Sequence, residues 1–210
     1  MSEALWRRMG YSRKVIEHFT NPRNVGVIED ADVTAKVGSV VCGDLIKLYL
    51  KIDDETEVIK DIKFESYGCA SNIATTSILT EMVKGKTIGE AKRVSFKDII
   101  RELGGLPKVK YHCAVLSKAG LDAAVLKYEV KKGRRKLDER AAKLLLKGVL
   151  DPASGLSVVE AGGIEELRVE GRRVYVKLRY KSGSREAEYV KESIEEAFSD
   201  LGVEVDVEAS

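Results

Sequence analysis

The chain has 210 residues, enough for one large domain or two small ones, and a chain of this length can bury a core without disulfide bonds. Its 36 Lys and Arg nearly balance its 34 Asp and Glu, which leaves a formal net charge of +2. This balance argues against a polybasic nucleic-acid binder and against an acidic disordered tail, because both need a net charge of one sign. With 44% hydrophobic and 33% charged residues, the composition is typical of a globular protein with a well-solvated surface.

Three cysteines are an odd and small number, which argues against a secreted disulfide framework and favours free thiols in a reducing compartment. Residues 1–20 carry charges throughout and contain no apolar run of signal-peptide length. No later stretch approaches the roughly 20 apolar residues that a bilayer crossing needs. We therefore expect a cytoplasmic protein with no membrane contact.

The first part of the chain predicts a helix, two strands and then a run of helices. Apolar residues at helical spacing indicate the helices, and alternation of apolar and charged residues indicates the strands. The expected helices are 11–20, 71–84, 96–103 and 112–130, and the expected strands are 45–52 and 58–67. Ser71 is the expected N-cap of the second helix, which Gly85 ends. This order predicts an α+β domain in which helices cover one face of a small antiparallel sheet.

The basic segment 131–137 interrupts this pattern, and we expect it to be a linker between domains 1–130 and 138–210. The second domain is smaller, and its periodicity also predicts an α+β unit. Its expected elements are a helix over 141–150, strands over 164–170 and 174–180, a helix over 189–201 and a strand over 203–207. This part of the sequence contains no Cys and no His, so metal chemistry is expected in the first domain alone.

The three cysteines, Cys42, Cys69 and Cys113, all fall at predicted junctions between elements. One free cysteine is often only a small buried apolar residue, but thiols at the ends of several elements can converge at one end of a sheet. Cys69 precedes a predicted helix, and Cys113 lies in the first turn of another. The partial positive charge of a helix N-terminus favours the thiolate, which is the form that binds metal.

Asp44 and His112 place a carboxylate and an imidazole next to these thiols in the sequence. Such a donor set suits zinc, ferrous iron or an iron–sulfur cluster, and an oxygen ligand is expected to hold a cluster loosely enough for delivery. A structural zinc domain is one alternative. A thiol enzyme with Cys113 as nucleophile and His112 as base is another, although adjacent helical residues diverge by about 100 degrees. His18 is expected to be an ordinary surface or packing residue.

Five sequence blocks, in order, resemble the iron–sulfur cluster scaffold family of the IscU and NifU type. The blocks are YSRKVIEHF from Tyr11, NPRNVG from Asn21, CGD from Cys42, YGCAS from Tyr67 and HCAVL from His112. The resemblance covers about residues 11–130. It implies a scaffold, not an enzyme, on which sulfur from a pyridoxal-phosphate cysteine desulfurase and iron form a 2Fe-2S cluster that is passed to apo-proteins.

The residues that match ligand positions of this family are Cys42, Asp44, Cys69, His112 and Cys113. The resemblance also implies that Cys113 is the persulfide acceptor, that Asp44 makes the site labile, that Lys110 lies near the site and that zinc often replaces iron. Whether Asp44 or His112 completes the coordination stays open. So does the question of whether the cluster bridges two subunits in a homo-oligomer.

Two departures from known patterns limit what the resemblance implies. Bacterial members carry a Leu-Pro-Pro-Val-Lys stretch recognised by a dedicated Hsp70 chaperone, but residues 106–110 read Leu-Pro-Lys-Val-Lys, so we do not assume that chaperone as a partner. The second domain resembles the small SufT and PaaD-like assembly domain but lacks the cysteine that many of those domains carry. Its expected role is docking of client or assembly proteins, with a purely structural role as the alternative.

Overall fold

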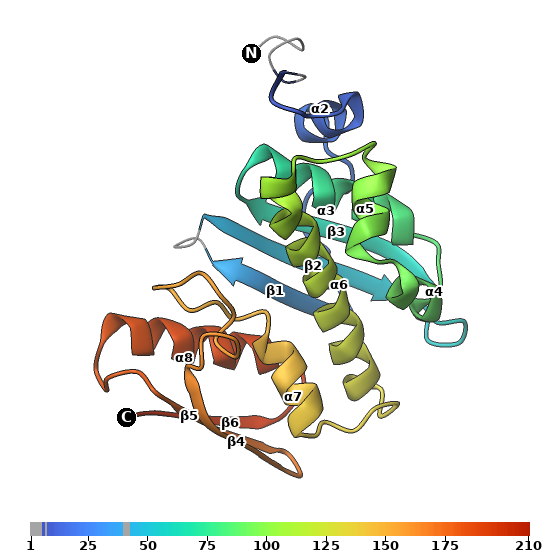
Figure 1. The fold of residues 1–210 in the computed structure, drawn as a ribbon. Helices are drawn as coiled ribbons and strands as arrows, with labels where there is room; N and C mark the ends of the chain where they lie inside the picture. Colours follow the sequence, from blue (N-terminus) through green and yellow to red (C-terminus); the bar gives the residue numbers. More distant parts are fainter. Residues whose placement is uncertain (1–5, 7, 40–42) are drawn as a thin grey trace.

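The computed structural model describes residues 6, 8–39 and 43–210 and arranges them in two packed α+β units (Figure 1). In the first unit, helices cover a three-stranded antiparallel sheet with the strand order β1-β2-β3. Its strands are β1 (Val33–Ser39), β2 (Asp44–Ile52) and β3 (Ile59–Tyr67), and its helices are α2 (Arg13–Thr20), α3 (Ala70–Val83), α4 (Ile88–Arg93), α5 (Phe96–Glu102) and α6 (Tyr111–Lys131). The α+β class expected from the sequence is confirmed.

The central strand β2 shows why this sheet has one covered face. Every second side chain, including those of Ile46, Leu48 and Leu50, is fully buried, because strand residues alternate between the two faces. These side chains share one apolar core with residues of α3 and α6, and both helices lie across the same side of the sheet (Figure 1). The sheet therefore holds the first turns of α3 and α6 in a fixed position.

One strand and one α-helix of the first unit were not predicted, nor was the short 3-10 helix η1 (Lys108–Lys110). Strand β1 has only Val33, Ala35 and Val37 as apolar residues, and near its end Gly38 has a φ of 85°. Helix α4 has six residues, too few to show a helical period, although Thr87 and Glu90 form a capping box that marks its start. In both cases the apolar pattern is too short to stand out from its surroundings.

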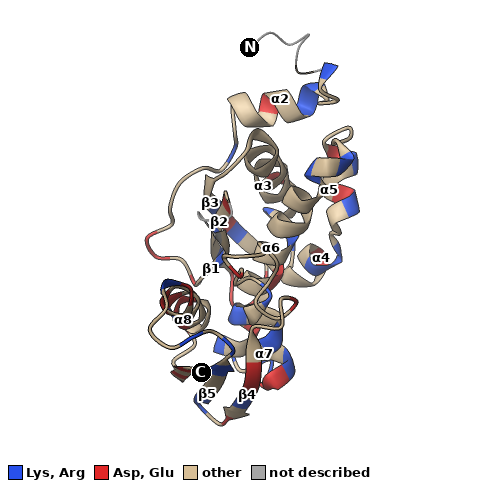
Figure 2. Ribbon diagram, turned by 60° about the vertical axis from the view of Figure 1, so that its left-hand side comes forward, with Lys and Arg blue, Asp and Glu red and all other residues tan. Residues whose placement is uncertain are grey.

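The predicted cap of α3 is wrong, because Cys69 and not Ser71 is the N-cap residue. Ser71 lies inside the first turn, fully buried, and its hydroxyl donates to the Tyr11 hydroxyl at 3.3 Å. Helix α3 is buried on most sides, and Figure 2 shows it almost free of charged residues, which gather on α4, α5, α7 and α8. Its buried hydroxyl groups are satisfied both within the helix, where Thr75 and Thr80 donate to α3 carbonyls, and by neighbouring elements. Among the described residues, no helix combines the length and the apolar character that a bilayer crossing requires.

His18 is a packing residue, as the sequence suggested. Its side chain is buried against α3, where Nδ1 lies 2.8 Å from the hydroxyl oxygen of Ser77. Burial lowers the pKa of His18, because it penalises the charged imidazolium. The imidazole therefore belongs to the contact between α2 and α3 and lies outside the group of candidate ligands.

The second unit packs its helices against a sheet with the order β4-β5-β6, in which β6 runs parallel to β5. Its elements are α7 (Glu139–Leu146), β4 (Ile164–Glu170), β5 (Arg173–Leu178), α8 (Arg185–Phe198) and β6 (Glu204–Ala209). Helix α7 ends four residues earlier than expected, and α8 begins four residues earlier, at Arg185, directly after its N-cap Ser184. The first turn of α8 is mostly polar, so an apolar period could not reveal it.

The two units share helix α6. Most of its buried residues belong to the first core, but Leu126 packs into the core of the second unit with Leu145 and Leu146 of α7. The basic segment after α6 makes a turn in which the Arg134 and Arg135 N–H groups donate to the Glu129 carbonyl. The chain thus folds back on α6, so that the second unit packs directly against the first.

Candidate metal centre

Three candidate ligands meet at one end of the first sheet. Asp44 begins β2, Cys69 is the N-cap of α3 and Cys113 lies in the first turn of α6. Their ligand atoms all lie within 4.8 Å of one another. Cys113 Sγ is 3.6 Å from Cys69 Sγ and 3.8 Å from Asp44 Oδ2. Two Zn–S bonds of about 2.3 Å at a tetrahedral angle span about 3.8 Å between sulfurs, so the pair is spaced to chelate one metal ion.

Asp44 is held in this group by close contact with the turn between β3 and α3. Its Oδ1 accepts a hydrogen bond from the Cys69 N–H at 3.1 Å. Gly68 leaves room for this contact, because a Cβ there would overlap Asp44 Oδ1 and would lie 2.7 Å from Asn72 Nδ2. The glycine before Cys69 is thus needed for the approach of the carboxylate, which a sequence pattern alone does not reveal.

The two thiols lie in hydrogen-bond contact, and their pKa values are shifted in opposite directions. The hydrogen bond from the Cys113 thiol lowers the pKa of Cys69 to about 5, and the Asn72 N–H also stabilises this thiolate. The pKa of Cys113 is raised, because its thiol donates to Cys69 and is fully buried. The negative charge of Cys69 in turn raises the pKa of Lys110. The expected thiolate at a helix N-terminus is therefore found at Cys69, whereas burial and the neighbouring thiolate outweigh the helix dipole at Cys113.

His112 lies at the edge of the group, with its side chain 58% exposed. Its Nε2 is 3.4 Å from Asp44 Oδ2, so the imidazole faces the carboxylate. This arrangement does not favour a pair in which His112 activates Cys113. It does place the two candidates for the remaining metal ligand side by side, and a metal ion could take either one.

The structure brings five of the six predicted site residues together, and Cys42 lies outside the described residues. Gly43, the described residue before Asp44, is exposed and has a φ of 86°. Asn72 was not predicted, although it is fully buried one turn after Cys69 and its Nδ2 donates to Ser66 Oγ at 3.1 Å. Its Oδ1 has no hydrogen-bond partner among the described residues. The one sequence signal for Asn72 was its place as the third residue of the helix that follows Cys69.

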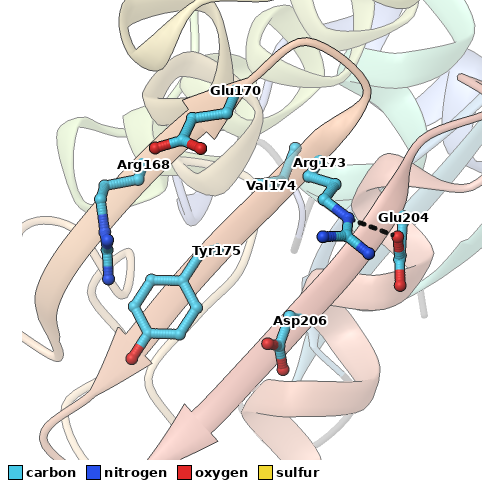
Figure 3. A pocket seen from close by; sticks show the side chains of 7 residues that line it. All are labelled: Arg168, Glu170, Arg173, Val174, Tyr175, Glu204 and Asp206. Carbon is cyan, nitrogen blue, oxygen red and sulfur yellow. Dashed lines mark hydrogen bonds and ion pairs between the residues drawn. The ribbon is translucent and has the colours of Figure 1, made fainter.

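A concavity lies on the outer face of the β4-β5-β6 sheet, away from the candidate ligands (Figure 3). Two of its charged residues pair with each other, since Arg173 bonds to Glu204 at 2.8 Å, and the guanidinium of Arg168 lies 4.6 Å from the centre of the Tyr175 ring. None of its lining residues is Cys or His. This pocket offers no soft ligand, so the metal chemistry belongs to the first unit.

An α+β domain that gathers two cysteines, an aspartate and a histidine at the ends of its elements has a donor set that could hold a metal ion through thiolates. Residues 10–135 match the protein family described as NifU-like N terminal domain. The chain therefore belongs to that family. Residues 139–210 match a second family, described as Iron-sulfur cluster assembly protein. Both resemblances found in the sequence are confirmed.

Curated relatives match the first unit. The iron-sulfur cluster assembly scaffold protein IscU of Aquifex aeolicus is 48% identical over 124 residues, which cover 59% of this chain and 79% of that protein. The scaffold protein IscU 1 of Archaeoglobus fulgidus is 52% identical over 124 residues, with 59% and 80% covered. The nitrogen fixation protein NifU of Azotobacter chroococcum is 50% identical over 118 residues, with 56% and 38% covered.

The substitution Gly68→Ala is expected to weaken metal binding, because the added methyl group would displace the Asp44 carboxylate. Loss of a residue that orients a ligand typically lowers metal affinity by about tenfold or more. Titration with Co²⁺, followed by its visible absorption, measures this effect. Gly89→Ala is the control, since a Cβ there meets nothing closer than 3.9 Å. Equal affinity in Gly68→Ala and the parent protein would contradict the argument.

In the metal-free, reduced protein, alkylation of Cys69 by iodoacetamide should be half-maximal near pH 5, because the thiolate is the reacting form. Cys113→Ala removes the hydrogen-bond donor, so the pKa of Cys69 should rise toward its ordinary value of about 8.5. At pH 6 the rate should then fall by more than about tenfold. Peptide mass spectrometry follows Cys69, and Cys42→Ala is the control that leaves this donor in place. A parent midpoint near pH 8.5 would contradict the lowered pKa of Cys69.

Proposed function

We propose that this chain is a scaffold on which an iron–sulfur cluster is assembled and from which the cluster is passed to apo-proteins. The observation that carries this proposal is the convergence of Asp44, Cys69 and Cys113 within 4.8 Å in a domain of the NifU-like family. Relatives named as cluster assembly scaffolds support it. The chain then receives sulfur and iron and releases a product cluster, without turning over a small-molecule substrate.

Sulfur would arrive as the persulfide of a cysteine desulfurase, with Cys113 as the acceptor. The Cys113 sulfur attacks the outer sulfur of that persulfide, a new S–S bond forms, and the donor's S–S bond breaks as its thiolate leaves. The Cys113 thiol gives up its proton in this step, and the Cys69 thiolate at 3.6 Å is placed to take it. Lys110 supports the exchange, because its positive charge stabilises negative charge on the sulfurs.

The cargo in this proposal is a 2Fe-2S cluster, held by Cys42, Cys69 and Cys113. Asp44 or His112 supplies the remaining ligand, and a carboxylate oxygen is a weaker ligand than a thiolate for an iron–sulfur cluster. Zinc is expected to compete for the same donors when iron is scarce. A site of this kind holds its cargo during assembly and gives it up to a protein that offers four cysteines.

The partners follow from this function: a cysteine desulfurase and apo iron–sulfur proteins, with the cytoplasm as the compartment. We assign the scaffold to residues 1–130, a basic linker to 131–137 and an assembly-factor domain to 138–210. The match of residues 139–210 to the family described as Iron-sulfur cluster assembly protein favours a docking role over a purely structural one. A cluster bridged between two copies of the chain is compatible with the position of His112 at the open edge of the site.

Anaerobic reconstitution tests the proposal. The chain is incubated with ferrous iron, cysteine and a desulfurase, and visible absorption and Mössbauer spectra should show a 2Fe-2S cluster. Cys69→Ser is the control, because a serine oxygen is a poor substitute for thiolate toward iron. Chelation of metal should leave the domain folded, whereas a structural zinc domain would unfold. Failure to form any cluster under these conditions would refute the scaffold.

Asp44→Ala should give a cluster that persists longer and is transferred more slowly, because a labile oxygen ligand and a route for ligand exchange are lost. The decay of the visible spectrum and the activation of an apo-ferredoxin measure the two effects. Asp61→Ala is the matched control, since Asp61 lies on β3 and pairs with Lys84 at the surface. Faster loss of the cluster in Asp44→Ala than in the parent would show that this role is wrong.

A further inference from the structure

The second unit is docked on the edge of the sheet that carries the metal centre. Strand β1 is the edge strand, and the Gly38 N–H donates a hydrogen bond to the Gly148 carbonyl at 3.0 Å. Lys36 Nζ, on the same strand, lies 2.5 Å from Glu196 Oε2 of α8. Figure 1 shows the chain after α7, and α8, running along the free side of β1. The second unit therefore occupies the edge that a further strand would otherwise take.

This contact is closely fitted. A Cβ at Gly148 would lie 2.8 Å from Val37 Cγ1, so the loop after α7 touches β1 with no space for a side chain. Lys127 of α6 is almost fully buried at the same boundary, with Nζ 3.7 Å from Asp200 Oδ2. Burial lowers the pKa of Lys127, so its amino group depends on that carboxylate to stay charged. Contacts of this kind hold the two units in one orientation.

Gly38 contacts Asp44 on its other side. In the antiparallel register Ser39 faces Asp44 and Gly38 faces Leu45, so this is the end of the β1–β2 ladder. A Cβ at Gly38 would overlap the Asp44 carbonyl oxygen, which shows how closely the two backbones approach. A single residue thus separates the second unit from the first residue of β2. A shift of β1 at Gly38 has to move the backbone of Asp44.

We propose that the second unit positions Asp44: its docking on β1, through Gly148 and Gly38, holds the carboxylate against Cys69 and Cys113, and undocking loosens it. Gly38 and Gly148 are positioning residues in this arrangement. The inference rests on the proposed function, in which Asp44 governs how firmly the cluster is held. The second unit then regulates retention of the cluster without contributing a ligand. A partner that displaces the second unit from β1 frees the Asp44 carboxylate, so the cluster is then passed on more slowly, as in Asp44→Ala.

Amide hydrogen exchange of the metal-free protein, followed by NMR, tests this proposal. The Gly38 N–H reports docking, because it bonds to Gly148, and the Cys69 N–H reports the placement of Asp44, because it bonds to Asp44 Oδ1. Glu196→Lys should undock the second unit by setting two lysines against each other. Both amides should then exchange about fivefold faster or more. Buried amides of β2, such as that of Leu48, should be unchanged, which separates this effect from a general loss of stability.

Two further variants control the experiment. Glu196→Lys combined with Lys36→Glu restores opposite charges and should restore both exchange rates. Glu195→Lys changes the neighbouring exposed residue of α8 and should leave both rates as in the parent. Gly148→Ala is an independent way to undock, because its methyl group would press on Val37. It should raise both rates without any change of charge.

The outcomes are distinct. Faster exchange at Gly38 with unchanged exchange at Cys69 would overturn the proposal, because the second unit would then be undocked without any effect on Asp44. Unchanged exchange at Gly38 in both Glu196→Lys and Gly148→Ala would also overturn it. With Co²⁺ bound, undocking should alter the visible spectrum and speed the loss of metal to a chelator. Failure of cluster reconstitution alone would refute the scaffold function and leave the exchange result standing.

Discussion

The metal centre depends on the close approach of the first residue of β2 to the turn between β3 and α3. The Asp44 carboxylate accepts the Cys69 N–H, and this contact exists only because position 68 has no side chain. The sheet and helices α3 and α6 hold the donors in place. Strand β2 positions the Asp44 carboxylate, and the buried contact of α3 with α6 positions the sulfurs of Cys69 and Cys113. A change in any of the three elements alters the spacing of the donors.

Three groups that can each carry a negative charge lie within 4.8 Å at this point. Without a cation they cannot all ionise, because like charges so close together oppose one another. The raised pKa of Cys113 favours its protonated form, which lowers the total negative charge and gives the Cys69 thiolate a hydrogen bond. A divalent cation removes the need for that proton. Binding of a divalent cation is therefore expected to release that proton.

The sequence predicted the parts of this molecule that depend on local pattern. The apolar periods located most helices and strands, and the junction positions of Cys69 and Cys113 indicated a common site. Three features escaped prediction because they depend on contacts distant in sequence. The Ser71 hydroxyl donates to Tyr11 and does not cap α3, the raised pKa of Cys113 needs the Cys69 thiolate, and the docking of Gly148 on β1 leaves no trace in the pattern of either segment.

Helix α6 passes from one core into the other, and this has a consequence for how the protein unfolds. Its residues near Leu121 pack in the first core, and Leu126 packs in the second. Loss of the second unit would expose an apolar stripe on a helix whose first turn carries Cys113. Local opening near α7 would therefore remove packing from the same helix that carries Cys113. Loss of packing in either unit is therefore expected to disturb the helix that positions Cys113.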